Sequence, residues 1–328
     1  WSALIIGGCA LVVFRLIRGW NQTGVKWRGG PDMSSLYVEW FTQRQVAWIG
    51  AMCGVCLCVA TSFIGRCHLG HLRERWWPLC FINVVSTFAA ILAKLNDDAV
   101  AARCVLATPT IVLLVSLWTS RHPRAPIDTI VVGVATSLSG YLFLLHTLRN
   151  SPLLLLLPCH AMCLYRLSTC LQTPGLPAPP LLVQTLGWAG HAAFFSLGNS
   201  NSINSIEISN AFVAQTEFDQ TTVGSLVASI VFTGPTLYAF VAVSSLVTHR
   251  LPHDARLALS AATAQWAAVR LSMVGFSCLI AFLMRDHLFT WTVFSPKVVY
   301  EVAHTAVFWL TTSVLHCFIA VSPDRPSF

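Results

Sequence analysis

The chain has 328 residues, of which 55% are apolar and only 10% are charged, and its mean hydropathy is +0.67. A soluble domain carries about 25% charged residues, so this composition excludes an ordinary water-soluble protein. The formal charge of +7 is read as a signal of membrane orientation, and we expect no nucleic-acid partner. The 12 cysteines lie mostly in apolar runs and are typical of small packing residues.

Apolar runs long enough to cross a membrane follow one another along the chain. A spanning helix needs about 20 mainly apolar residues, and charges, prolines or glycines end each run. We therefore predict an all-α, polytopic transmembrane helix bundle, with residues 1–328 forming one multi-pass membrane domain. The ten predicted spans are about 1–18, 45–65, 77–95, 99–118, 127–148, 151–170, 181–197, 220–248, 257–284 and 298–320.

The linkers between these spans alternate between the two sides of the membrane. On this count Lys94, Arg149 and Glu207 fall on one side. Outside the first linker, the opposite side carries nine Lys and Arg against four, which favours placing that opposite side in the cytoplasm. The first linker belongs to the same side as Glu207, and its basic residues bring the two totals level at nine each. Asn21 begins an Asn-Gln-Thr glycosylation sequon, which is usable only if this side is lumenal.

The linker between the seventh and eighth spans is rich in amide and hydroxyl side chains. Residues 198–210 contain four Asn and four Ser between two apolar spans. These groups donate and accept hydrogen bonds without the desolvation cost of a full charge, which suits a sugar or a lipid headgroup. A flexible polar loop is the alternative interpretation of the same pattern.

Several polar side chains fall inside the predicted spans, where each costs free energy unless it has a partner. Arg270 lies centrally in the span 257–284, so we expect it to pair with a carboxylate, such as Glu301 on the next span. Two interpretations of such a pair stay open. It is either a structural ion pair inside the bundle or part of a pathway for a headgroup or an ion. Glu301 and His304 share a helix face, a spacing compatible with a metal or proton site, although no second ligand pair accompanies them. The other polar residues in the spans are His146, His160, Arg166, Gln184, His191 and Gln265.

The sequence carries no motif of a self-sufficient active site. GxSxG, P-loop and HExxH patterns are absent, as is a large cluster of aqueous acids and histidines. Two other classes of protein therefore stay open. A multi-pass solute transporter or lipid flippase predicts a water-filled path between spans, and a noncatalytic membrane scaffold predicts that the polar linker tolerates substitution.

Three segments, in order along the chain, resemble the membrane portion of the glycosylphosphatidylinositol (GPI) ethanolamine phosphate transferases, and most closely the type 2 enzymes that modify the second mannose. The first runs from Arg18-Gly19-Trp20-Asn21-Gln22-Thr23-Gly24 to Gly30-Pro31-Asp32. The second is Leu197-Gly198-Asn199-Ser200-Asn201-Ser202-Ile203 with Ser205-Ile206-Glu207-Ile208-Ser209-Asn210-Ala211. The third is Arg285-Asp286-His287-Leu288-Phe289-Thr290-Trp291-Thr292-Val293-Phe294-Ser295-Pro296-Lys297, followed by Tyr300-Glu301.

The resemblance implies a multi-pass enzyme of the endoplasmic reticulum that transfers ethanolamine phosphate from phosphatidylethanolamine to a mannose of the GPI precursor. In that family the chemistry belongs to a lumenal domain similar to alkaline phosphatases, where a threonine nucleophile works between two zinc ions. That domain precedes the membrane bundle, and this chain opens at Trp1 in an apolar run. We therefore expect a fragment without catalytic residues, metal ligands or cofactors of its own, which is inactive alone.

The resemblance also implies partners and an interface. The partners are the two lipid substrates and a small hydrophobic membrane subunit shared by the family. The polar linker is expected to contact a headgroup or to dock the catalytic domain. Its candidate residues are Asn199, Asn201, Ser202, Ser205, Glu207 and Asn210; the intramembrane candidates are Arg270, Glu301 and His304, and Asn21 is the glycosylation candidate.

Overall fold

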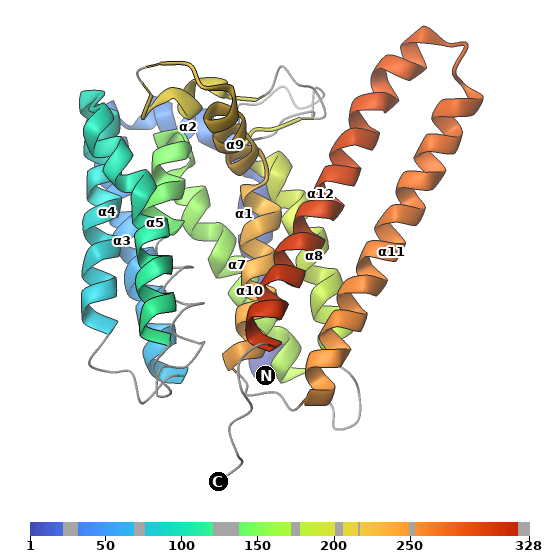
Figure 1. Cartoon of the computed structure of the whole chain (residues 1–328), viewed down its shortest axis with the longest axis horizontal. Helices are drawn as coiled ribbons and strands as arrows, with labels where there is room; N and C mark the ends of the chain where they lie inside the picture. The colour runs from blue at the N-terminus through green and yellow to red at the C-terminus, as the bar shows by residue number, and fades with distance from the viewer. Residues whose placement is uncertain are drawn as a thin grey trace. The chain divides into compact units, whose positions relative to one another are not determined.

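The computed structural model describes residues 1–21, 32–68, 76–120, 138–171, 178–200, 206–215, 217–248 and 253–320. Every regular element within these ranges is a helix (Figure 1), so the predicted all-α class is confirmed. The chain divides into two compact units, each described here by itself. The first unit comprises Trp1–Arg28, Leu157–Ile206 and Phe232–Phe328, and the second comprises Gly29–Leu156 and Glu207–Val231.

The first unit is built around α8. This helix packs against α1, α10 and α11, and α12 packs against α10 and α11. Small residues let the helices approach closely, because a Cβ added at Gly234 would lie 2.9 Å from the Cβ of Ala193. The helices of this unit are α1 (Ser2–Trp20), α8 (Ala178–Ser196), α10 (Thr233–Thr248), α11 (His253–Leu283) and α12 (Leu288–Ala320), with most of α7 (Ser151–Cys170).

The second unit contains three consecutive helices that pack side by side, α3 on α4 and α4 on α5 (Figure 1). A separate cluster of buried apolar residues joins Leu145 and Ala211 to one face of α9. The helices of this unit are α2 (Met33–Trp40), α3 (Gln43–His68), α4 (Trp76–Asn96), α5 (Ala99–Ser120), η1 (Leu148–Asn150), η3 (Ile208–Phe212) and α9 (Gln220–Val231).

Three aspartates begin helices of the second unit as N-caps, among them Asp98, which accepts from the N–H groups of Val100 and Ala101 at the start of α5. Asp32 accepts a 2.9 Å hydrogen bond from the backbone N–H of Ser35 at the start of α2. Asp219 accepts one of 2.7 Å from the N–H of Thr222 at the start of α9. Burial acts to raise the pKa of Asp32, but its bonds to Ser35 outweigh burial and lower that pKa. The bonds to Thr222 lower the pKa of Asp219.

The helices differ from the predicted spans in three places. The predicted span 220–248 is two helices broken at Phe232, because Pro235 has no N–H to donate and its ring clashes with the carbonyl four residues earlier. The span predicted to begin at residue 298 begins at Leu288 and runs through Pro296. The first part of the span 127–148 lies outside the described residues, and residues 138–145 are helical.

Three described helical segments are long and apolar enough to cross a membrane on their own. They are Ser2–Trp20, Leu148–Cys170 and Ala261–Leu283. The segments Gln220–Val231 and Thr233–Ala242 make a fourth if the broken pair crosses as one span. The chain is thus a helical membrane protein, and its count of about ten spans stays a prediction.

Candidate functional site

The first described part of the polar linker caps α8. The last carbonyls of a helix have no partner within the helix. Asn199 is buried and its side-chain Nδ2 donates a 3.2 Å hydrogen bond to the carbonyl of Phe194. Gly198 adopts a φ of +100°, a left-handed conformation that favours glycine and ends many helices. Asn199 therefore stabilises the end of α8, and its predicted contact with a substrate or with the catalytic domain stays a prediction.

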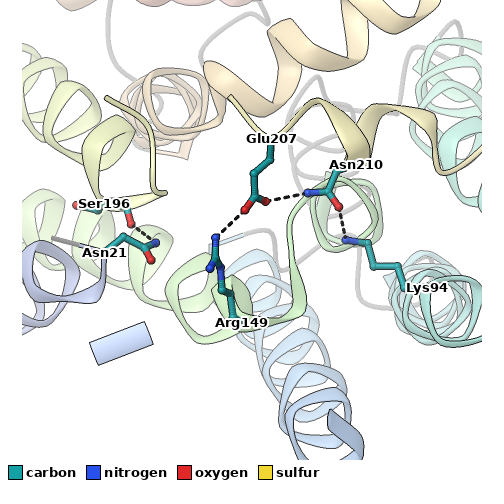
Figure 2. Close-up of polar contacts among 6 residues, drawn as sticks. All are labelled: Asn21, Lys94, Arg149, Ser196, Glu207 and Asn210. Atoms are coloured by element: carbon teal, nitrogen blue, oxygen red, sulfur yellow. Dashed lines mark hydrogen bonds and ion pairs between the residues drawn. The ribbon is translucent and has the colours of Figure 1, made fainter. Parts of the chain in front are cut away.

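Asn21 caps the same helix from α1. Its Nδ2 donates a 2.8 Å hydrogen bond to the carbonyl of Ser196 (Figure 2), and the residue is 7% exposed. Nδ2 is the atom to which an N-linked glycan attaches; a glycan would leave it one N–H and would need space around a residue that is buried here. The rest of the sequon lies outside the described residues, and glycosylation at Asn21 stays a prediction.

Replacing Asn199 with alanine is expected to destabilise the first unit by about 1 kcal/mol, the usual net contribution of one hydrogen bond. The measurement is the midpoint of thermal unfolding in detergent. Asn96→Ala is the matched control, because Asn96 also ends a helix, α4, but is exposed. Equal midpoints for the two variants would contradict the capping role.

The second described part of the linker carries an ion pair at its start. Arg149 of η1 donates through Nη2 to Oε1 of Glu207 over 2.6 Å, and the two side chains are 45% and 39% exposed. The other carboxylate oxygen, Oε2, accepts a 3.1 Å hydrogen bond from Nδ2 of Asn210. Figure 2 shows Glu207 between Arg149 and Asn210. Each of its two carboxylate oxygens therefore accepts a hydrogen bond from one of these residues.

Further contacts tie this segment to α4 and α5. Lys94, near the end of α4, donates to the backbone carbonyl of His146 and lies 3.5 Å from Oδ1 of Asn210 (Figure 2). Arg103 of α5 donates through Nε to the carbonyl of Ala214 over 2.9 Å. Residues 206–215 are thus held by three cations from three helices, and we call this set, with Glu207 and Asn210, the linker network.

The linker network presents a half-exposed guanidinium and a half-exposed carboxylate side by side. These are the groups that complement a phosphate and an ammonium group respectively. Sequence reasoning placed Lys94 and Arg149 on the same side as Glu207 but gave neither a role. Both residues lie at the ends of apolar runs, and this position was the signal in the sequence from which a role at the linker could have been predicted.

Three of the predicted linker residues, Asn201, Ser202 and Ser205, lie outside the described residues. Within the described ranges, no three His, Cys, Asp or Glu side chains are grouped closely enough to hold a metal ion. The two zinc ions implied by the family resemblance stay a prediction about another domain.

The intramembrane candidates come together in the first unit. Arg270 of α11 donates to Oε2 of Glu301 on α12, as predicted for a buried arginine with a carboxylate on the next span. Oε1 of the same carboxylate lies 3.0 Å from Nε2 of His191 on α8. His304 lies one turn beyond Glu301 and packs its ring on Phe194, 4.4 Å between centroids. Sequence reasoning did not assign His191 to this group.

Comparison with known proteins gives the family. A family model described as GPI ethanolamine phosphate transferase membrane region matches residues 80–322. Human "GPI ethanolamine phosphate transferase 2, catalytic subunit" is 27% identical over 99% of this chain and 33% of its own length. "GPI ethanolamine phosphate transferase 2" of Aspergillus oryzae is 25% identical over 94% of this chain and 33% of its own.

A third relative, the "GPI ethanolamine phosphate transferase 2" of Schizosaccharomyces pombe, is 31% identical over 39% of this chain and 15% of its own length. The chain thus spans a third or less of the length of these three relatives. No solved structure is significantly similar to it. With the family model covering most of the chain, this protein belongs to the GPI ethanolamine phosphate transferase family and contains its membrane region.

Proposed function

We propose that this chain is the membrane region of an enzyme of the endoplasmic reticulum that transfers ethanolamine phosphate from phosphatidylethanolamine to the second mannose of a GPI precursor. The observation that carries the proposal is the match to human GPI ethanolamine phosphate transferase 2 over 99% of the chain. Both substrates are lipids, so a bundle of about ten spans has a direct use: it admits them laterally. Family membership favours neither a solute transporter nor a scaffold.

The phosphoryl transfer itself belongs, on this proposal, to a domain outside the chain. The relatives are about three times as long as the region matched here, and a two-zinc domain like that of alkaline phosphatases would supply the nucleophile and the charge stabilisation. The membrane region alone is then inactive. A small hydrophobic membrane subunit is the third partner that we propose.

The linker network is the part of the chain that we assign to the substrate. Phosphatidylethanolamine carries a phosphate and a primary ammonium, and Arg149 and Glu207 offer one matching group for each. The contacts of Lys94 and Arg103 fix residues 206–215, so the pair is presented in a defined geometry. Docking of the catalytic domain on the same segment is the alternative role.

The experiment is expression of the full-length gene in cells that lack type 2 activity, followed by mass spectrometry of their GPI precursors. The expected result is ethanolamine phosphate on the second mannose. Addition to a different mannose would contradict the type 2 assignment, and precursors without any added group, despite normal protein level, would contradict the transferase assignment.

A further inference from the structure

A patch of exposed apolar side chains lies beside the linker network in the second unit. Ile208, Phe212 and Phe218 are 48%, 40% and 70% exposed, and we call these three residues the apolar patch. The rings of Phe212 and Phe218 are stacked, with their centroids 6.2 Å apart. The neighbouring ion pair is made by other side chains, Arg149 and Glu207. The substrate contact proposed for that pair therefore does not explain why the apolar patch is exposed.

The backbone around the apolar patch is held in place by burial and by hydrogen bonds. Ala211, which precedes Phe212, is fully buried in a cluster with apolar residues of α9. The carbonyl of Phe212 accepts a 3.0 Å hydrogen bond from the N–H of Gln215. Asp219, which follows Phe218, caps the first turn of α9. Groups that are fixed before binding lose less conformational entropy when they bind, so the apolar patch is preorganised for a contact.

The residues around Phe218 are polar and acidic. Glu217 and Asp219 flank it in the sequence, and Thr221 and Thr222 follow in the first turn of α9; all four are exposed. An exposed apolar patch with a polar rim marks a contact with a membrane or with another protein. Membrane interfaces favour Trp, Tyr and basic residues, whereas Phe218 has a carboxylate on each side. The surroundings therefore favour a protein over the bilayer.

The protein that fits this patch has an apolar surface with basic residues around it. Aromatic side chains inside a polar rim carry much of the binding energy of protein interfaces, and the rim of Glu217 and Asp219 complements Lys or Arg. A covering domain is available in the same polypeptide, because the human and Aspergillus oryzae relatives are about three times as long as the region matched here.

We propose that the apolar patch docks the catalytic domain of the full-length protein. This proposal rests on the proposed function, which places the catalytic domain outside this chain. Docking on Ile208, Phe212 and Phe218 would hold that domain next to the linker network, and hence next to the Arg149–Glu207 pair that we assign to the substrate.

Photo-crosslinking in microsomes tests the contact directly. The photoreactive residue p-benzoylphenylalanine is placed at position 218 of the full-length protein, and a site for a sequence-specific protease is placed between the catalytic domain and Trp1. After irradiation the protein is solubilised in detergent and cut. We expect the two pieces to stay joined at the mass of one chain, with the crosslinked peptide coming from the catalytic domain.

The matched control carries the photoreactive residue at position 81. Phe81 is 69% exposed, as Phe218 is to within one per cent, but it lies near the opposite end of α4 from Lys94 of the linker network. Position 81 is expected to give two separate pieces after cutting. Equal joining from positions 218 and 81 would overturn the docking site.

The other products at position 218 identify other occupants of the patch. Pieces that separate after cutting, with or without an attached lipid, would overturn docking of the catalytic domain. A product of twice the mass of one chain before cutting would place a second copy on the patch, and any other added mass would place a different protein there. Either result would also overturn the proposal.

Substitution of the same residue tests whether docking matters for transfer. Phe218→Ala is expected to lower transfer by about tenfold at an unchanged unfolding midpoint, because the side chain is exposed, whereas Phe218→Tyr keeps the ring and is expected to retain transfer. Phe81→Ala is the matched control. Wild-type transfer by Phe218→Ala would contradict the docking role.

The crosslink does not depend on which group the enzyme transfers. Joined pieces from an enzyme that modifies a different mannose would contradict only the type 2 assignment. Separate pieces from an enzyme that modifies the second mannose would contradict only the docking of the catalytic domain on the apolar patch.

Discussion

Glu301→Leu is expected to lower the free energy of unfolding by about 3–5 kcal/mol, the cost of leaving a buried charge without its partner. Arg270 is 2% exposed and bonds to this carboxylate, and its guanidinium stays charged under all ordinary conditions. The measurement is unfolding of the purified chain in mixed micelles by increasing SDS, followed by circular dichroism.

The double variant Arg270→Leu with Glu301→Leu shows whether the pair or the packing carries the effect. Removing both charges is expected to recover most of the stability, because apolar residues of similar volume often replace a buried ion pair at little cost. Glu217→Leu is the control, since Glu217 is exposed and its loss should change stability by less than about 0.5 kcal/mol. A single variant as stable as this control would contradict the ion pair.

Reversing the charge of Glu207 is expected to reduce transfer by about tenfold or more in the full-length enzyme while leaving the unfolding midpoint nearly unchanged. The Arg149–Glu207 pair is exposed, and exposed pairs contribute about 0–1 kcal/mol to stability. Its effect should therefore fall on the substrate. The measurement is transfer of labelled ethanolamine phosphate in microsomes, normalised to protein level.

The exchanged pair, Arg149→Glu with Glu207→Arg, separates headgroup contact from loop shape. It restores the ion pair but exchanges the positions of its two charges. The phosphate and the ammonium of a zwitterion would then each meet a group of their own sign, so transfer is expected to stay low. Exchange of Arg285 with Asp286, an exposed pair at the tip of the α11–α12 hairpin, is the matched control and should leave transfer at the wild-type level. Full rescue by the Arg149–Glu207 exchange would show that the pair only shapes the linker.

Composition and periodicity predicted the helical class and most helix positions, because apolar runs and their charged ends are local signals. The break at Phe232 was missed although Pro235 was visible, since proline is tolerated inside α5, α7 and α12. Whether a proline breaks a helix depends on the neighbours that re-satisfy the freed carbonyl, and those neighbours are not local in sequence. Helix α2 was missed because its N-cap, Asp32, stands in a linker.

The sites were predicted unevenly for a similar reason. The partner of Arg270 followed from the cost of an unpaired charge in a span, and Glu301 was the acidic residue on the next one. The roles of Asn21 and Asn199 were not predictable, because a polar linker composition does not distinguish an amide that faces a substrate from one that caps a helix. Only packing places Nδ2 of each against a carbonyl of α8.

The most direct test of the central claim is a chimera in which this chain replaces the matching third of the human type 2 enzyme. The chimera is expressed in cells lacking that enzyme, and their GPI precursors are analysed by mass spectrometry. Ethanolamine phosphate is expected to reappear on the second mannose, and Glu207→Arg within the chimera is expected to reduce it by about tenfold or more. A chimera that is made at normal level, reaches the endoplasmic reticulum and adds no ethanolamine phosphate would contradict the assignment of this chain as a type 2 membrane region.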